Sequence, residues 1–146
     1  MSKKQALSLL RTAKSSHIQW RSDVQGYLLG LHVDTRKLPI IHTDSQFGNW
    51  YYTQGQKLSS LPSYKEINLN LEEVFIKYRE LYKFLHSTPK KAGLFSSQAK
   101  IDDQRQGQKQ KLMDDLLHSS QALIATTTEL ENELMKMSDE EFDKLL

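Results

Sequence analysis

The sequence contains no cysteine, which excludes disulfide bonds and thiolate metal ligands. It also has no apolar run near the roughly 20 residues that a bilayer-spanning helix needs. The N-terminal segment lacks the continuous apolar stretch of a signal peptide. We therefore expect a soluble cytoplasmic protein without membrane insertion, and a reducing compartment is compatible with the absence of cysteine.

The chain also carries little net charge, only +2 over 146 residues. A value this small does not by itself indicate nucleic-acid binding. Basic residues gather in the first 40 positions, which fits either a weak surface for an anionic partner or an ordinary solvated helix face. We favour the solvated face and do not expect nucleic-acid binding, because no run of aromatic residues accompanies these charges for base stacking. The basic residues concerned are Lys3, Lys4, Arg11, Lys14, Arg21, Arg36 and Lys37.

Motifs of enzymatic chemistry are missing as well. The sequence has no Gly-x-Ser-x-Gly elbow, no glycine-rich phosphate loop and neither His-Glu-x-x-His nor Glu-x-x-His. The carboxylate pairs Glu72-Glu73 and Asp102-Asp103 are adjacent in sequence, so on a helix the two side chains of each pair point about 100° apart. We therefore predict that the protein is not an enzyme.

Apolar residues recur at alternating steps of three and four, which predicts amphipathic helices over about residues 2–31, 64–87 and 98–136. A helical part at 1–87 is then joined by a connection at 88–100 to a C-terminal part at 98–146. The first stripe is Leu10, Ala13, His17, Trp20, Val24, Tyr27 and Leu31. The second is Ile67, Leu71, Val74, Tyr78, Leu81 and Leu85, and the third is Leu112, Leu116, Leu123, Thr127, Leu130, Leu134 and Met137.

Capping residues predict where helices begin. Ser2 with Gln5, Ser63 with Glu66, and Ser138 with Glu141 have the spacing of capping boxes. Either Asp44 or Ser45 is suited to cap a short second helix at 45–54, and a short acidic helix closes the chain at 139–146. In the loop at 32–44 we expect Leu38, Ile40 and Ile41 to pack on the core. The sequence thus predicts an all-α fold resembling a four-helix bundle, with a short second helix and a short C-terminal helix.

Two aromatic-rich stretches carry a family resemblance. His17 lies in His-Ile-Gln-Trp, ending at Trp20, and Ser45 begins Ser-Gln-Phe-Gly-Asn-Trp, which includes Phe47, Gly48 and Trp50. Over roughly residues 10–85 this pairing resembles the chemoreceptor zinc-binding family of bacterial helical bundles. The resemblance implies that Trp20, Phe47, Gly48 and Trp50 belong to the core.

That family holds zinc with a histidine on the first helix, a cysteine on the second and two histidines on the third. His17 matches the first position, but Ser45 stands where the cysteine belongs, and Leu71 and Phe75 fall at the histidine pair. The resemblance therefore implies a degenerate member that has lost its metal and folds without a cofactor. We expect His17 to be a buried histidine bonded to Ser45 or Tyr51.

A second interpretation keeps a metal. Imidazole and carboxylate groups also bind zinc, so His17 together with His42, Asp44 and Glu72 would form a site with non-standard ligands. On this interpretation the protein is a zinc or other metal sensor.

The resemblance also implies a function. Family members are usually attached to chemoreceptors or diguanylate cyclases and change their output when zinc binds. We expect no attached signalling or catalytic domain and therefore a stand-alone adaptor, either monomeric or homodimeric, for a chemoreceptor, diguanylate cyclase or related component of chemotaxis or cyclic-di-GMP signalling. We expect contacts through the helix at 98–136 and the tail at 138–146, although the tail also fits folding back onto its own domain. The tail residues concerned are Phe142, Leu145 and Leu146.

Overall fold

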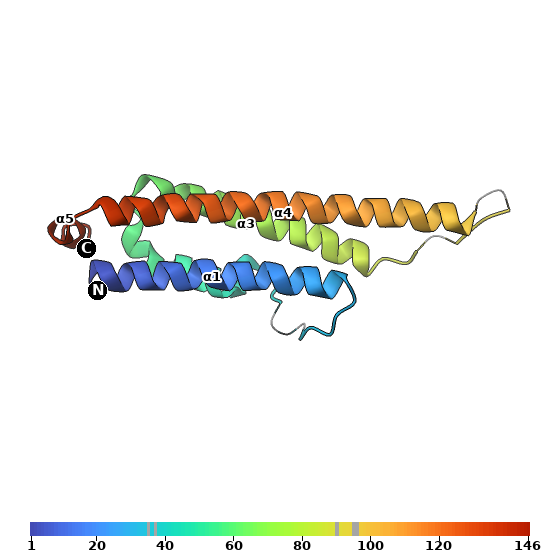
Figure 1. The fold of residues 1–146 in the computed structure, drawn as a ribbon, viewed down its shortest axis with the longest axis horizontal. Coiled ribbons are helices and arrows are strands. Elements are labelled where there is room, and N and C mark those ends of the chain that lie inside the picture. Colours follow the sequence, from blue (N-terminus) through green and yellow to red (C-terminus); the bar gives the residue numbers. More distant parts are fainter. Residues whose placement is uncertain (35, 37, 90, 95–96) are drawn as a thin grey trace.

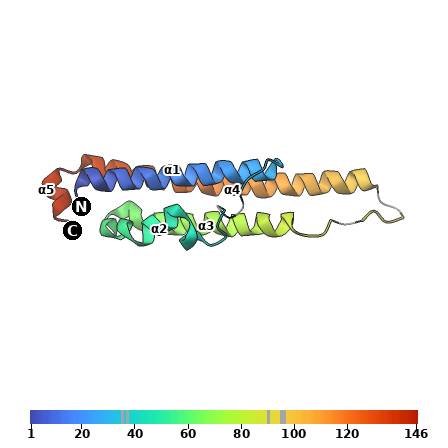
Figure 2. The same ribbon diagram turned by 90° about the horizontal axis from the view of Figure 1, so that it is seen from below.

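The protein folds as an all-α bundle, as the sequence predicts. The structure is a computed structural model that describes residues 1–34, 36, 38–89, 91–94 and 97–146. Three long helices, α1 (Lys3–Leu28), α3 (Pro62–Leu85) and α4 (Gln98–Lys136), run along the length of the molecule (Figures 1 and 2). No strand occurs among the described residues, and none of their helices is long and apolar enough to cross a membrane. Lys37, which belongs to the basic group named above, and parts of the predicted loop at 32–44 and connection at 88–100 lie outside the described ranges.

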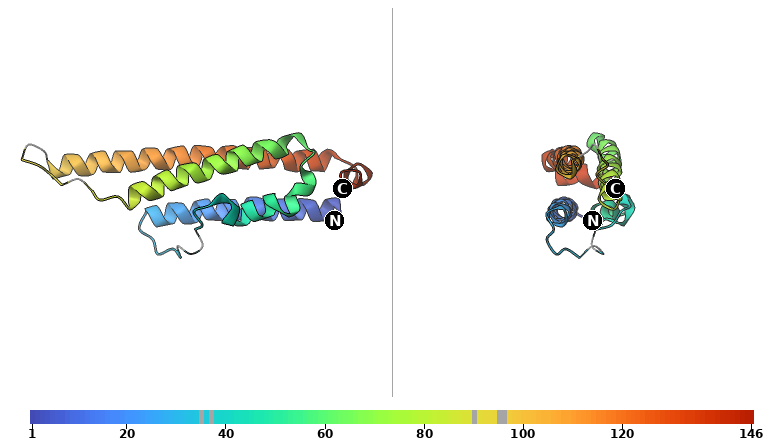
Figure 3. Two further views of the ribbon diagram at one scale, coloured as in Figure 1. Left: turned by 180° about the vertical axis from the view of Figure 1, so that it is seen from behind. Right: turned by 90° about the vertical axis from the view of Figure 1, so that its right-hand side faces the viewer.

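Among the described residues, four short elements accompany these three helices. They are η2 (His42–Asp44), α2 (Gln46–Tyr52), η3 (Gln54–Leu58) and α5 (Asp139–Asp143). The end-on view in Figure 3 shows α1, α3 and α4 at three corners of the bundle and the α2 segment near the fourth. Helix α2 has 7 residues, whereas α1, which lies beside it, has 26.

Helix α1 ends three residues before the predicted boundary. Gly30 has a φ of 78°, its N–H donates to the Tyr27 carbonyl, and the Leu31 N–H donates to the Gly26 carbonyl. This pair of bonds is a Schellman motif, in which a left-handed glycine stops the helix. Leu31 therefore leaves the apolar stripe and is 62% exposed, so its predicted burial is wrong.

Three of the predicted helix starts are confirmed. Ser2 and Gln5 form the capping box of α1, and Ser138 accepts from the Glu141 N–H at the start of α5. Of the two residues suited to cap α2, Ser45 is the cap, because its hydroxyl accepts from a backbone N–H of the first turn. Asp44 instead ends the preceding η2.

The predicted capping box at the start of α3 is wrong. The N-cap is Leu61 and Pro62 is the first helical residue, a position that suits proline because its N–H would be unpaired there anyway. Ser63 is therefore already inside the helix, and its hydroxyl hydrogen-bonds the Glu133 carboxylate of α4. This bond joins α3 to α4 across 70 positions of sequence, so the pattern Ser63-x-x-Glu66 did not reveal it.

The loop between α1 and α2 is anchored by one of its three predicted residues. Leu38 is buried, whereas Ile40 and Ile41 are 40% and 52% exposed. The Arg79 guanidinium of α3 donates to the Ile40 carbonyl at 3.3 Å, which holds this part of the loop against α3 through its backbone. The two isoleucine side chains are consequently left at the surface.

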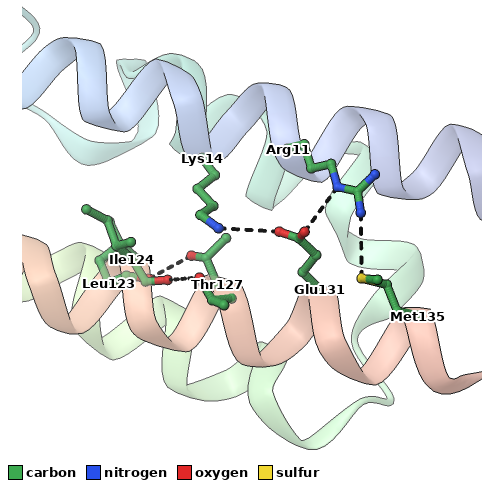
Figure 4. A network of polar contacts seen from close by, with 8 residues as sticks. Arg11, Lys14, Leu123, Ile124, Thr127, Glu131 and Met135 are labelled. Carbon is green, nitrogen blue, oxygen red and sulfur yellow. Dashed lines mark hydrogen bonds and ion pairs between the residues drawn. The ribbon is translucent and has the colours of Figure 1, made fainter.

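A cluster of polar contacts joins α1 to α4 (Figure 4). Glu131 accepts from Arg11 Nε at 3.0 Å and lies 3.4 Å from Lys14 Nζ, and Arg11 also donates to the Met135 sulfur. Partial burial opposes ionisation of Glu131, but the bonds and charges of the two cations outweigh it and hold the pKa of the carboxyl below its usual value. The cluster therefore fixes the alignment of the two helices near the termini.

Candidate functional site

The buried histidine predicted on α1 is present, with a different partner. His17 is 3% exposed, and its Nε2 lies 2.8 Å from Ser120 Oγ of α4, so the expected bond to Ser45 or Tyr51 is wrong. Its ring stacks on that of Trp20 with 5.5 Å between centroids. The sequence did contain a signal for this partner, since Ser120 interrupts the apolar stripe of α4 where an apolar residue is expected.

Burial determines the charge state of His17. Desolvation, reinforced by the positive charge of Arg21, lowers the pKa of the imidazole to about 4. The ring is consequently neutral at pH 7, with one nitrogen protonated and the other bare. Nε2 is engaged by Ser120, and no hydrogen bond to Nδ1 is formed by the residues that the structure describes.

The positions that match the other family ligands have structural roles here. Ser45 Oγ donates to the His42 carbonyl at 2.7 Å and accepts from the Gly48 N–H at 2.9 Å, so it caps α2. Leu71 and Phe75 are buried in the core. Apolar side chains at these two positions need no hydrogen-bond partner.

The residues of the alternative metal site do not assemble as a ligand set. His42 lies beside the rings of Tyr52 and Phe75, at 5.8 and 6.4 Å, and Glu72 accepts from Asn68. Asp44 is exposed in η2. Within the described part of the chain, no three or more His, Asp or Glu side chains are grouped so that they could hold a metal ion.

The signature aromatic residues of α1 and α2 are in the core, as expected. Trp20, Phe47 and Trp50 are each at most 6% exposed. Gly48 lies so close to the preceding turn that a Cβ there would stand 1.9 Å from the His42 carbonyl oxygen. Glycine at this position therefore lets α2 approach η2, which the sequence motif alone did not explain.

A pocket of about 680 Å³ opens where α1 faces the start of α2. One part of its wall is aromatic, formed by Trp20, Phe47 and Phe75. The pocket thus includes the matched family positions His17, Ser45 and Phe75, although they form no metal cluster. Its three aromatic lining residues are at most 6% exposed, so most of the accessible surface of the pocket comes from the other lining residues. The remaining lining residues are Ser16, Gln19, Asp23, Arg36, Pro39, Asp44 and Gln46.

The tail folds back onto the bundle. Phe142 of α5 is completely buried, Leu145 is partly buried against the core, and Leu146 is 53% exposed. Lys3 Nζ donates to the Met137 carbonyl at 2.6 Å, which ties the start of the tail to α1. Phe142 is therefore a core residue in this structure, and Leu146 is the tail candidate with a largely accessible side chain.

Comparisons with known proteins found no family model, no curated protein and no solved structure that matches this chain.

Proposed function

We propose that this chain is a non-enzymatic regulatory module that acts through protein–protein contacts. In keeping with the resemblance described above, the partner is a chemoreceptor, a diguanylate cyclase or a related signalling component, and the contact takes place in the cytoplasm. The observation that supports a contact function best is a group of exposed branched apolar side chains beside α3. These are Ile40, Ile41 and Ile76, and we call them the isoleucine surface.

The isoleucine surface has a structural basis in the loop before α2. Ile76 lies on α3 and is 41% exposed. Arg79 lies one turn further along α3 and donates to the Ile40 carbonyl, so the backbone at Ile40 lies beside the part of α3 that carries Ile76. Apolar side chains that are exposed together favour association with a partner, whereas isolated exposed ones need no such explanation.

The isoleucine surface supports the proposal better than the surfaces expected from sequence. In the tail, Phe142 is withdrawn into the core. In α4, residues 98–112 contain no buried side chain and are mostly charged or amide residues. Such a polar helix face lacks the apolar centre that protein interfaces usually have.

The absence of cysteine allows a direct test, because a single introduced cysteine is the unique thiol of the chain. The Ile76→Cys variant, labelled with a photoactivatable maleimide, is expected to crosslink to a signalling protein in lysate from the native cells. The matched control is Leu94→Cys, at a 99% exposed leucine in the connection between α3 and α4. The adduct is identified by mass spectrometry, and it is expected from Ile76→Cys but not from Leu94→Cys.

Two outcomes would contradict the proposal. Equal adducts from both variants would mean that labelling is non-specific, and an adduct with a second copy alone would replace the signalling partner by a homodimer. As a second arm, Ile41→Glu is expected to reduce capture of the crosslinked protein at least tenfold, while Leu94→Glu leaves it unchanged. Unfolding curves of both variants check that the change acts on the surface and not on the fold.

A further inference from the structure

A second pocket, of about 210 Å³, opens between the end of α1 and the first half of α4. Because α1 stops early, Leu29 lies at its C-cap, where the side chain is 80% exposed and lines the pocket. Leu28 and Leu117 also line it and are partly buried, and the buried Met113 completes the apolar part of the lining. The pocket therefore offers apolar surface that solvent and a ligand can reach, with Leu29 as its most exposed member.

One side chain of this lining is charged. The Lys109 ammonium donates to the Leu28 carbonyl at 2.8 Å, and since it has three N–H donors, two remain for a ligand. The lining contains no Asp or Glu, and no ion pair to Lys109 is formed within the described part of the chain. The C-terminal end of α1 carries only about half a negative charge, less than the full charge of the ammonium. The pocket is therefore net positive where α1 ends.

The remaining lining residues are three exposed glutamines, Gln25, Gln106 and Gln110. Gln110 donates to the Asp114 carboxylate at 2.9 Å, so this neighbouring anion already has a partner outside the lining. The side-chain amides of Gln25 and Gln106 form no hydrogen bond with other described residues. Their N–H groups can therefore add to Lys109 in binding an anion.

The size and lining of the pocket define the class of ligand. Its volume corresponds to about seven water molecules at roughly 30 Å³ each, which is comparable to a chain of about six to eight carbons. An apolar lining with one cation and no carboxylate matches a molecule that is apolar over most of its length and carries one negative charge at its end.

We propose that this pocket binds a medium-chain aliphatic carboxylate such as octanoate. The carboxylate accepts from Lys109 Nζ and from the amide of Gln25 or Gln106, and the alkyl chain lies against Leu29 and Leu117. The inference goes beyond the contact function proposed above and does not depend on it. The pocket contains no residue of the isoleucine surface, and binding is measured on the isolated protein.

The four methionines of the chain provide the readout. Met113 lines the pocket, whereas Met1 precedes α1, and Met135 and Met137 contact Arg11 and Lys3 in the first half of α1. Labelling the methionine methyl groups with ¹³C gives one NMR signal for each, and Met113→Leu assigns the signal of the pocket. Octanoate is expected to shift the Met113 signal in a saturable manner and to leave the signals of Met135 and Met137 unchanged.

Two further probes test the assigned chemistry on the unaltered protein. Octylammonium has the same chain with the opposite charge, so it is expected to bind at least about tenfold more weakly than octanoate, as the loss of a charged hydrogen bond predicts. Hexanoate is shorter by two methylenes and is expected to bind about fourfold more weakly. That factor is about twofold for each methylene, roughly half the free energy of full burial, because the pocket is open to solvent on one side.

A matched pair of variants tests the cation. Lys109→Gln is expected to weaken octanoate binding about tenfold, because one charged hydrogen bond is lost. Lys111→Gln removes the same charge from an exposed position of α4 outside the lining, and it is expected to leave the affinity unchanged. The comparison separates direct contact with Lys109 from a general effect of net charge.

The proposal is overturned if octanoate, titrated up to its micelle concentration, gives no saturable shift of the Met113 signal. It is also overturned if octylammonium binds as tightly as octanoate, or if Met135 and Met137 respond with the same concentration dependence as Met113. An equal loss of affinity in Lys109→Gln and Lys111→Gln would overturn it as well. The probe comparisons use the unaltered protein, so they stand even where a variant fails to fold.

Discussion

Replacing Gly48 by alanine is expected to destabilise the protein strongly, although alanine is ordinarily the better helix residue. The added Cβ would stand 1.9 Å from the His42 carbonyl oxygen and 2.9 Å from its carbon. Both atoms are backbone, so no side-chain rotation relieves the clash. Either α2 moves away from η2, or the turn that Ser45 caps is distorted.

The magnitude follows from two opposing effects. Overpacking a tight site costs typically about 1–3 kcal/mol, and a backbone clash this close belongs at or above the upper end of that range. Helix propensity returns about 1 kcal/mol when alanine replaces glycine. We therefore expect a net loss of about 2 kcal/mol or more for Gly48→Ala.

The matched control is Gly107→Ala in α4. A Cβ at Gly107 meets nothing within 4 Å, so only the propensity effect remains, and the protein is expected to gain at most about 1 kcal/mol. Urea unfolding followed by circular dichroism measures both variants against the wild type. If Gly48→Ala is as stable as the wild type, or is stabilised like Gly107→Ala, the close approach of α2 to η2 is wrong.

Three further predictions follow from buried groups. The pKa of His17 is about 4 in the fold and about 6.5 in the unfolded chain, so the stability that its neutral ring contributes is complete above pH 6.5 and is lost as the pH falls toward 4. Between pH 7 and 5 the free energy of unfolding is expected to fall by about 2 kcal/mol, and this loss is expected to be absent in His17→Leu. Glu131→Gln is expected to cost about 1 kcal/mol, with the loss shrinking at high salt, whereas the exposed Glu129→Gln costs little. Phe142→Ala is expected to cost about 3–5 kcal/mol and Leu146→Ala less than about 0.5 kcal/mol, and equal unfolding curves for these two would contradict the packing of α5.

Features governed by neighbouring residues were predictable from the sequence. The bounds 98–136 of α4 agree with the structure, Ser2 and Ser138 cap the helices that they were expected to cap, and Ser45 is the cap of α2 from the two candidates Asp44 and Ser45. Capping and apolar periodicity act within a few positions of the chain, so the residues that decide them are adjacent in sequence. The early end of α1 was also signalled locally by Gly30, but the apolar stripe continuing to Leu31 outweighed that signal in the prediction.

The candidate site was only partly predictable. His17 was identified as a lone buried histidine, and the aromatic residues around it were assigned to the core. Its bond to Ser120 spans 103 positions, and the pocket joins residues from α1, the loop before α2 and α3. Ser120 is visible in the sequence as an interruption of the apolar stripe, but no local pattern pairs it with His17, because that pairing depends on how the helices cross and not on where each one begins.

The sequence by itself determined the all-α class, the long helices and most of their caps, because these follow from local propensity and periodicity. Tertiary packing decided which side chains are buried and which polar groups form hydrogen bonds. It buries Phe142, turns Ile40 and Ile41 outward, pairs His17 with Ser120 and leaves the Trp20 N–H without a hydrogen-bond partner among the residues that the structure describes. The physical reason is that burial and hydrogen bonding across helices depend on the positions of residues far apart in the chain, which exist only once the bundle has assembled.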